Sequence, residues 1–173
     1  MKNLRITTLV GALALLAMFP APAPAVAQEA VRATLRGFEE PPSISTTGRG
    51  KFHATISDDQ TSIEYELSYS GLEGEVRQAH IHLGQRGVNG GISIWLCQTE
   101  TNPDPTGLSP TCPQEGTVTG VVSADNVIGP GGQGIAAGEL AEVLRAIRNG
   151  VTYANVHSSL RPGGEIRGQI SAD

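Results

Sequence analysis

Aromatic residues and positive charge are both scarce in this chain. Only 4% of its 173 residues are aromatic, and 12 Lys and Arg stand against 17 Asp and Glu, which gives a formal net charge of −5. The acidic balance argues against electrostatic binding to nucleic acid or to anionic lipid. The few aromatic side chains could line little of a deep pocket. We therefore expect neither a nucleic-acid partner nor a deep ligand pocket.

The chain also lacks an apolar run long enough to span a bilayer. Its most apolar stretch, residues 9–19, follows a basic start and precedes the small residues Ala25 and Ala27, an arrangement typical of a secretory signal peptide. We predict a signal peptide over residues 1–27 and an exported protein, located in the periplasm or the medium. Residues 28–173 are predicted to form a single domain without a membrane span.

Cysteine is limited to two residues, Cys97 and Cys112. An oxidising compartment favours a disulfide between them, which would close a loop of about 15 residues and add ~3 kcal/mol of stability in the chain-entropy model. Two free thiols or a metal-binding pair are the alternatives. The disulfide prediction requires the two Cα atoms to lie within about 7 Å.

Alternation of apolar and polar residues predicts short β-strands along most of the chain. Phe52, Ala54 and Ile56 share one face of a predicted strand, and the next strand carries its apolar residues on one face in the same way. Gly, Pro, Asn and Asp separate the strands. About eight strands are predicted, over residues 30–37, 51–57, 62–69, 76–83, 92–97, 117–123, 152–158 and 165–171. A β-sandwich or Greek-key barrel follows from this pattern.

One segment has helical periodicity instead. Leu140, Val143, Leu144 and Ile147 recur at helical spacing, with acidic residues near the start of the segment and basic residues near its end. Gly150 follows as a suitable C-terminal stop. We predict one short helix within about residues 139–149, which covers an open end of the sandwich or lies over a sheet edge.

The same alternation places two histidines away from the core. In the strand over residues 76–83, the apolar residues take one face, so His80 and His82 share the opposite, polar face. His157 projects outward from a later strand by the same argument. Glu165 is predicted to face outward from the last strand. These strands therefore offer a polar constellation.

Three stretches together resemble the CHRD domain, a module named for chordin and found also in exported bacterial proteins. They are "AHIHLGQRGVNGGI", "GELAEVLRAIRNGVTYANVHS" and "RPGGEIRGQI", in this order. The resemblance covers about residues 30–170. It implies an immunoglobulin-like or superoxide-dismutase-like Greek-key β-sandwich, which here carries one short helix, and it implies no settled biochemical activity.

A more distant similarity is to copper/zinc superoxide dismutases, which also carry an HxH pair on a strand and a later histidine in a VH segment. The similarity is partial, because the chain contains no histidine between His82 and His157. A dismutase with two metals needs more histidines in that interval, so the sequence does not support one. A single metal held by three imidazoles is compatible with it.

Three functional interpretations stay open. The first is a non-catalytic extracytoplasmic module that binds a protein or a surface ligand. Trp95 then caps the polar face, anchors the contact or is buried by a second sheet. The second is a mononuclear copper or zinc protein that uses His80, His82 and His157, with water or Glu165 in a fourth position, at a site open to solvent. The third is an enzyme, for which we identify no catalytic residues, since no nucleophile and base form a recognisable motif.

Overall fold

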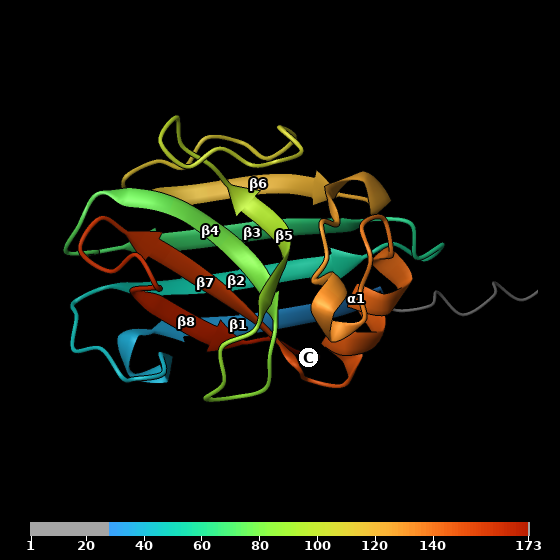
Figure 1. Cartoon of the computed structure of the whole chain (residues 1–173), viewed down its shortest axis with the longest axis horizontal. Coiled ribbons are helices and arrows are strands. Elements are labelled where there is room, and N and C mark those ends of the chain that lie inside the picture. Colours follow the sequence, from blue (N-terminus) through green and yellow to red (C-terminus); the bar gives the residue numbers. More distant parts are fainter. Residues whose placement is uncertain (1–27, 173) are drawn as a thin grey trace, which may run out of the picture.

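The computed structural model describes residues 28–172, so the predicted signal peptide lies outside the described residues. Figure 1 shows strands in two layers with a single α-helix at one end. The strands are β1 (Glu29–Arg36), β2 (Arg49–Ile56), β3 (Ile63–Ser70), β4 (Val76–Leu83), β5 (Gly91–Cys97), β6 (Gly116–Val122), β7 (Thr152–Ser158), β8 (Ile166–Gln169) and β9 (Ser171–Ala172), and the helix is α1 (Leu140–Arg148). Short 3-10 turns occur at Gly37–Glu39, Ala124–Asn126 and Gly131–Gln133.

The strands form one hydrogen-bonded sheet in the order β5-β4-β7-β8-β1-β2-β3-β6. Every strand pairing is antiparallel. The sheet curls so that β5, β4, β7 and β8 lie over β1, β2, β3 and β6 (Figure 1). The predicted all-β sandwich with one short helix is confirmed.

The last predicted strand is divided in two. β8 pairs with β7, whereas β9 pairs with β1, and Ile170 stands between them. The Ile170 N–H donates to the Thr152 carbonyl, so the chain leaves β7 only after this bond. The two-residue strand β9 accounts for the difference between the eight predicted strands and the nine observed.

The core lies between the two layers and follows the period-two pattern. The apolar residues of β2 and β3 point into it and are buried. Tyr65 and Tyr69 are buried too. The Tyr65 hydroxyl donates to the carbonyl of Leu96 in the facing layer (2.6 Å), and the Tyr69 hydroxyl donates to that of Pro113, shortly before β6 (2.7 Å). These bonds satisfy the buried phenols.

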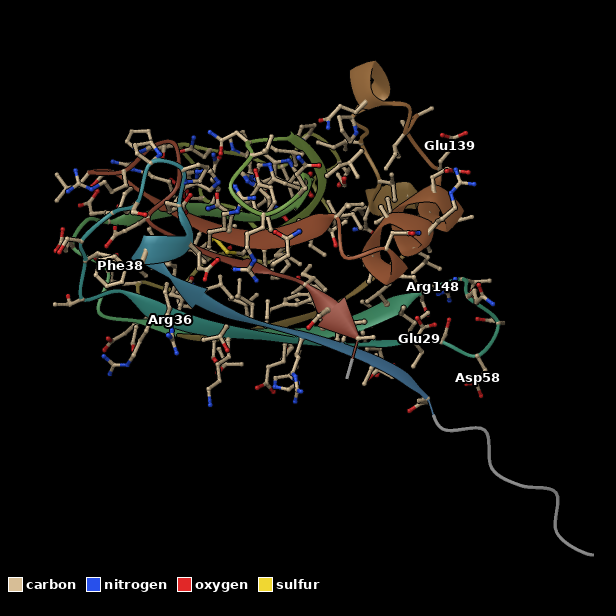
Figure 2. All side chains as sticks on the ribbon, turned by 90° about the horizontal axis from the view of Figure 1, so that it is seen from below. Glu29, Arg36, Phe38, Asp58, Glu139 and Arg148 are labelled. Carbon is tan, nitrogen blue, oxygen red and sulfur yellow. A yellow bond between two sulfur atoms is a disulfide. The ribbon has the colours of Figure 1, made fainter. Side chains whose placement is uncertain are left out.

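Helix α1 covers one end of the sandwich, as the amphipathic pattern allowed (Figure 1). Its four predicted apolar residues are all buried. Arg148, near the helix end, pairs with Glu29 at 2.6 Å at the start of β1, and both side chains lie on that side of the molecule in Figure 2. Gly150 has a φ of 64°, a left-handed conformation that suits glycine after a helix. Within residues 28–172, none of the helices has the length and apolarity needed to cross a membrane.

The two cysteines form a disulfide. Their Cα atoms lie 5.0 Å apart, within the predicted limit. Cys97 is the last residue of β5, and Cys112 lies shortly before β6. These are the two edge strands of the sheet, so the disulfide links one edge to the chain that enters the other. It closes the polar loop between them.

Candidate metal centre

Adjacent strands bring the three histidines together. β4 pairs with β7, and its residues His80 and His82 lie opposite Asn155 and Tyr153. His157 lies two residues after Asn155 on β7, so it shares the same face. One potential ligand atom from each imidazole lies within 4.8 Å of the others. The three predicted histidines thus form one cluster, drawn from two neighbouring strands.

The cluster is buried, which corrects the expectation of a site open to solvent. His80 is fully buried, and His82 and His157 are 7% and 6% exposed. The outer faces of β4 and β7 are covered because three loops fold over them and contact their polar side chains. The covering segments are residues 37–48, 84–90 and 159–165.

Backbone carbonyls fix the tautomers of two histidines. His82 Nδ1 lies 3.0 Å from the Gly90 carbonyl, and His157 Nδ1 lies 2.9 Å from the Pro162 carbonyl. A carbonyl oxygen only accepts, so each Nδ1 carries the proton and donates it. Both Nε2 atoms are therefore left with a lone pair, the form that binds a metal.

Glycine is required at Gly90 by close packing. A Cβ at this position would lie 1.6 Å from the Leu83 carbonyl oxygen. The absent side chain lets the Gly90 carbonyl reach His82 and its N–H donate to the Tyr153 hydroxyl at 3.2 Å. The "VNGG" stretch after the HxH pair thus orients an imidazole.

The third histidine lies between the other imidazoles and a tryptophan. His80 Nδ1 is 3.1 Å from His157 Nε2. Because His157 Nε2 has a lone pair, His80 Nδ1 carries the proton in this hydrogen bond, and His80 Nε2 is left unprotonated. Among the described residues, neither His80 Nε2 nor His82 Nε2 has a hydrogen-bond partner, although both are buried. Each such atom costs roughly 1–3 kcal/mol.

A single metal ion fits this arrangement of nitrogens. Two imidazole nitrogens bound to one tetrahedral ion at about 2.0–2.1 Å lie roughly 3.3 Å apart. The separation between His80 and His157 is 3.1 Å. An ion bound to both nitrogens would leave the His80 proton on Nε2, and the nitrogen of His82, within 4.8 Å of the others, would complete the set of three ligands.

The environment keeps all three imidazoles neutral. Burial lowers the pKa of His80 far below its usual range, and the neighbouring imidazoles lower it further. Burial also lowers the pKa of His82 and of His157 to about 4, against the opposing effect of their hydrogen bonds to carbonyls. The cluster therefore presents lone pairs rather than protons at neutral pH.

Glu165 is not brought to the histidines. Its carboxylate accepts hydrogen bonds from Thr46 Oγ1 and the Glu73 N–H, both at 2.7 Å, and from the Ser158 hydroxyl. Ser158 shares the core-facing side of β7 with Val156, opposite His157. Glu165 precedes β8, so the strand alternation that predicted an outward direction does not reach it.

Trp95 caps the polar face. It projects from β5 opposite the core residues, as predicted, but it is only 8% exposed because its ring packs against His80, with ring centroids 4.3 Å apart. Its indole Nε1 is buried and has no hydrogen-bond partner among residues 28–172. A buried indole cannot anchor an external partner, so of the alternatives given by the sequence a cap on the polar face agrees with the position of Trp95.

An arginine holds one covering loop over the site. The Arg167 guanidinium carbon lies 3.3 Å from the centroid of the Tyr153 ring, which stacks in parallel on His82 at 4.7 Å. Arg167 also donates to the carbonyls of Gln85 (3.0 Å) and Val88 (2.9 Å). The stack and these bonds fix both the loop and the imidazole.

A second polar cluster, which the sequence did not predict, borders the histidines. Asn155 Nδ2 donates to Glu40 Oε1 at 2.5 Å, and Glu40 is buried, which raises its pKa to about 7. A Cβ on Gly164 would lie 2.5 Å from Asn155 Nδ2 and 2.6 Å from Glu40 Oε1. The sequence signals for this cluster are the single Asn of "YANVH" and the glycines of "PGGEIRGQ".

The CHRD domain family model matches residues 31–170. The match covers most of the chain, so the protein belongs to the CHRD family. It includes β4, β7 and β8 and every residue of the histidine cluster. No curated protein and no solved structure matches the chain.

Proposed function

We propose that this protein is an exported, non-catalytic binding module and that it binds a single copper or zinc ion through His80, His82 and His157. The observation that carries the proposal is the convergence of three buried, neutral imidazoles whose proton positions are set by neighbouring groups. Neutral imidazole is a good ligand for both copper and zinc.

The groups around the imidazoles support binding rather than a purely structural role. Metal-binding histidines usually donate their other ring N–H to a carbonyl or carboxylate, which orients the ring. His82 and His157 both do so. A structural cluster would satisfy its buried nitrogens internally, whereas here the lone pair of His82 Nε2, which faces the cluster, lacks a partner.

Export is part of the proposal. The predicted signal peptide and the disulfide between Cys97 and Cys112 agree with an oxidising compartment, either periplasm or medium. Extracellular binding is also the role that CHRD membership suggests. The metal ion is then the partner, and no nucleic acid or membrane span is involved.

Calorimetric titration of tag-free protein with Zn(II) and Cu(II) tests the proposal. We expect one ion per chain for the wild type and loss of binding in His82→Ala and His157→Ala. His53→Ala is the matched control, because His53 is exposed on β2 and lies outside the cluster. Unchanged binding in both site variants, or a wild type that binds none of Zn(II), Cu(II) and, under ascorbate, Cu(I), would end the metal interpretation.

A further inference from the structure

We infer that the site selects Cu(I) over Zn(II) and Cu(II). The inference rests on the proposed function and specifies the ion. Three features of the cluster carry it: the neutrality of its donors, the cation stacked behind His82, and the closed surroundings of His80.

The donors add no negative charge. Among residues 28–172, the group of potential ligands contains three imidazoles and neither a carboxylate nor a thiolate. The described chain has no free cysteine. A dication in this site would keep its full charge in a buried position. The cost of burying an ion rises with the square of its charge, so a dication costs roughly four times as much as a monocation.

The nearby carboxylates are already occupied. Glu165 accepts hydrogen bonds from Thr46, Ser158 and the Glu73 N–H. Glu40 accepts from Asn155, and burial raises its pKa to about 7, so its charge near neutral pH is partial. Neither carboxylate belongs to the group of potential ligands, so neither would bring its charge into direct contact with a divalent ion.

A fixed positive charge lies behind one ligand. Arg167 rests on Tyr153, and Tyr153 is stacked on His82. Guanidinium stays protonated in proteins, so the stack directs a permanent positive charge toward the site. Its repulsion of a dication is twice its repulsion of a monocation at the same position.

The number of ligands in the cluster also favours Cu(I), because only three imidazoles are present. Zn(II) sites in proteins are almost always four-coordinate, and a three-histidine zinc site needs water as the fourth ligand. Here His80 is fully buried and Trp95 packs on its ring. Cu(I) has a filled d shell and is stable with three ligands, so it does not need a water molecule in this enclosed space.

An entry route reaches the cluster at His157. A cleft of about 220 Å³ is lined by this histidine together with Arg77, Gln78, Asn102, Ser158, Ser159 and Pro162. An ion can therefore reach one of the three ligands directly from this cleft. The other two imidazoles need not be exposed for loading.

Anaerobic competition on the tag-free protein tests the inference. Copper is supplied as Cu(I) with ascorbate, a reductant mild toward disulfides, in the presence of a chromophoric Cu(I) chelator, and Zn(II) is then added in roughly 100-fold excess. Trp95 is the only tryptophan and touches His80, so its fluorescence reports loading directly. We expect one Cu(I) per chain, quenched fluorescence, retention of copper against Zn(II), and no Cu(II) resonance signal after admission of air.

The possible results separate the two proposals. Displacement of Cu(I) by Zn(II), or a Cu(II) signal from bound copper in air, would overturn the selectivity and leave metal binding intact. Absence of binding by Cu(I), Cu(II) and Zn(II) alike would overturn both. His53→Ala is expected to behave as the wild type in every arm.

A substitution next to the site tests the coordination argument. Trp95→His offers a fourth imidazole beside His80 and opens space for water, so we expect Zn(II) affinity to rise at least tenfold, roughly 1.4 kcal/mol, relative to Cu(I). Unchanged relative affinity in a folded variant would contradict the coordination argument. If this variant does not fold, the wild-type competition still decides the inference.

Discussion

The two outer faces of the sandwich have the same sequence pattern and opposite environments. On β2, the outward residues Arg49, Lys51 and His53 alternate with buried ones and are exposed to solvent. On β7, all seven residues are buried, outward and inward alike. The exposed kind of residue is visible in Figure 2 at Arg36 of β1, whose labelled side chain extends outward from the lower face.

The two outer faces differ because loops cover one of them and leave the other open to solvent. The outward residues of β4 and β7 lie beneath the segments 37–48, 84–90 and 159–165, and those loops return hydrogen bonds to them. The open face has polar side chains because water solvates them. On the covered face, each polar side chain needs a partner, which makes that face far less tolerant of change and suited to a site.

The largest expected effect of a substitution is on the covered face at Arg167. Arg167→Ala removes the donor to two loop carbonyls and the cation on Tyr153, so we expect a loss of about 4 kcal/mol in the free energy of unfolding. Arg49→Ala on the open face should change it by less than about 0.5 kcal/mol. Urea unfolding with the disulfide intact measures both. Equal losses of stability in the two variants would show that the covered face is no less tolerant of substitution than the open face.

Acid should destabilise the metal-free protein through the covered face. His82 and His157 have a pKa of about 4 when folded and near 6.5 when unfolded, so the unfolded state binds more protons between these values and stability falls as the pH falls. Each contributes about 1.4 kcal/mol per pH unit. Glu40, with its pKa raised to about 7, opposes them down to pH 4.5. The net loss from pH 6.5 to 4.5 is about 3 kcal/mol or more.

Urea unfolding of chelator-treated protein at several pH values measures this slope. Glu40→Gln removes the opposing contribution, so the variant should lose stability more steeply with acid than the wild type. A flat profile between pH 7 and 5 would mean that the imidazoles already titrate as they do in the unfolded chain, and the covered face would then be as solvated as the open one.

Two neighbouring glycines give a sharper comparison within one loop. Gly164 has a φ of 127°, and a Cβ there would collide with Asn155 and Glu40, whereas a Cβ on Gly163 would meet nothing within 4 Å. We expect Gly164→Ala to cost about 2 kcal/mol and Gly163→Ala to stay within about 0.5 kcal/mol. Thermal unfolding of the two variants compares them. Equal melting temperatures would show that the loop does not pack closely on Asn155.

The smallest expected effect is a gain on the open face. Arg36 and Arg49 lie directly opposite each other on β1 and β2, and both are exposed. Like charges in this position destabilise a sheet, so Arg49→Glu should add about 0.5 kcal/mol at low salt. The gain should shrink as salt is added. If the gain in stability does not depend on salt, its cause is packing or strand propensity and not charge repulsion.

Much of the fold was predictable because its signals are local. The alternation around Phe52, the spacing of Leu144 and the placement of Gly150 each depend on neighbours a few residues away. His80, His82 and His157 were also predictable as a group, because alternation fixed their faces and the family-like stretches suggested that their strands are neighbours. Alternation does not fix the direction of the Glu165 side chain, because the strand begins one residue after it.

The sequence by itself determined the strands, the helix, the disulfide pair and the identity of the three imidazoles, since each depends on periodicity, composition or spacing along the chain. The tertiary structure alone decided that these imidazoles are buried, that carbonyls from Gly90 and Pro162 set their protons, and that Trp95 and Arg167 enclose them. Those facts depend on the paths of the loops over the sheet. Contacts between residues far apart in the chain set those paths.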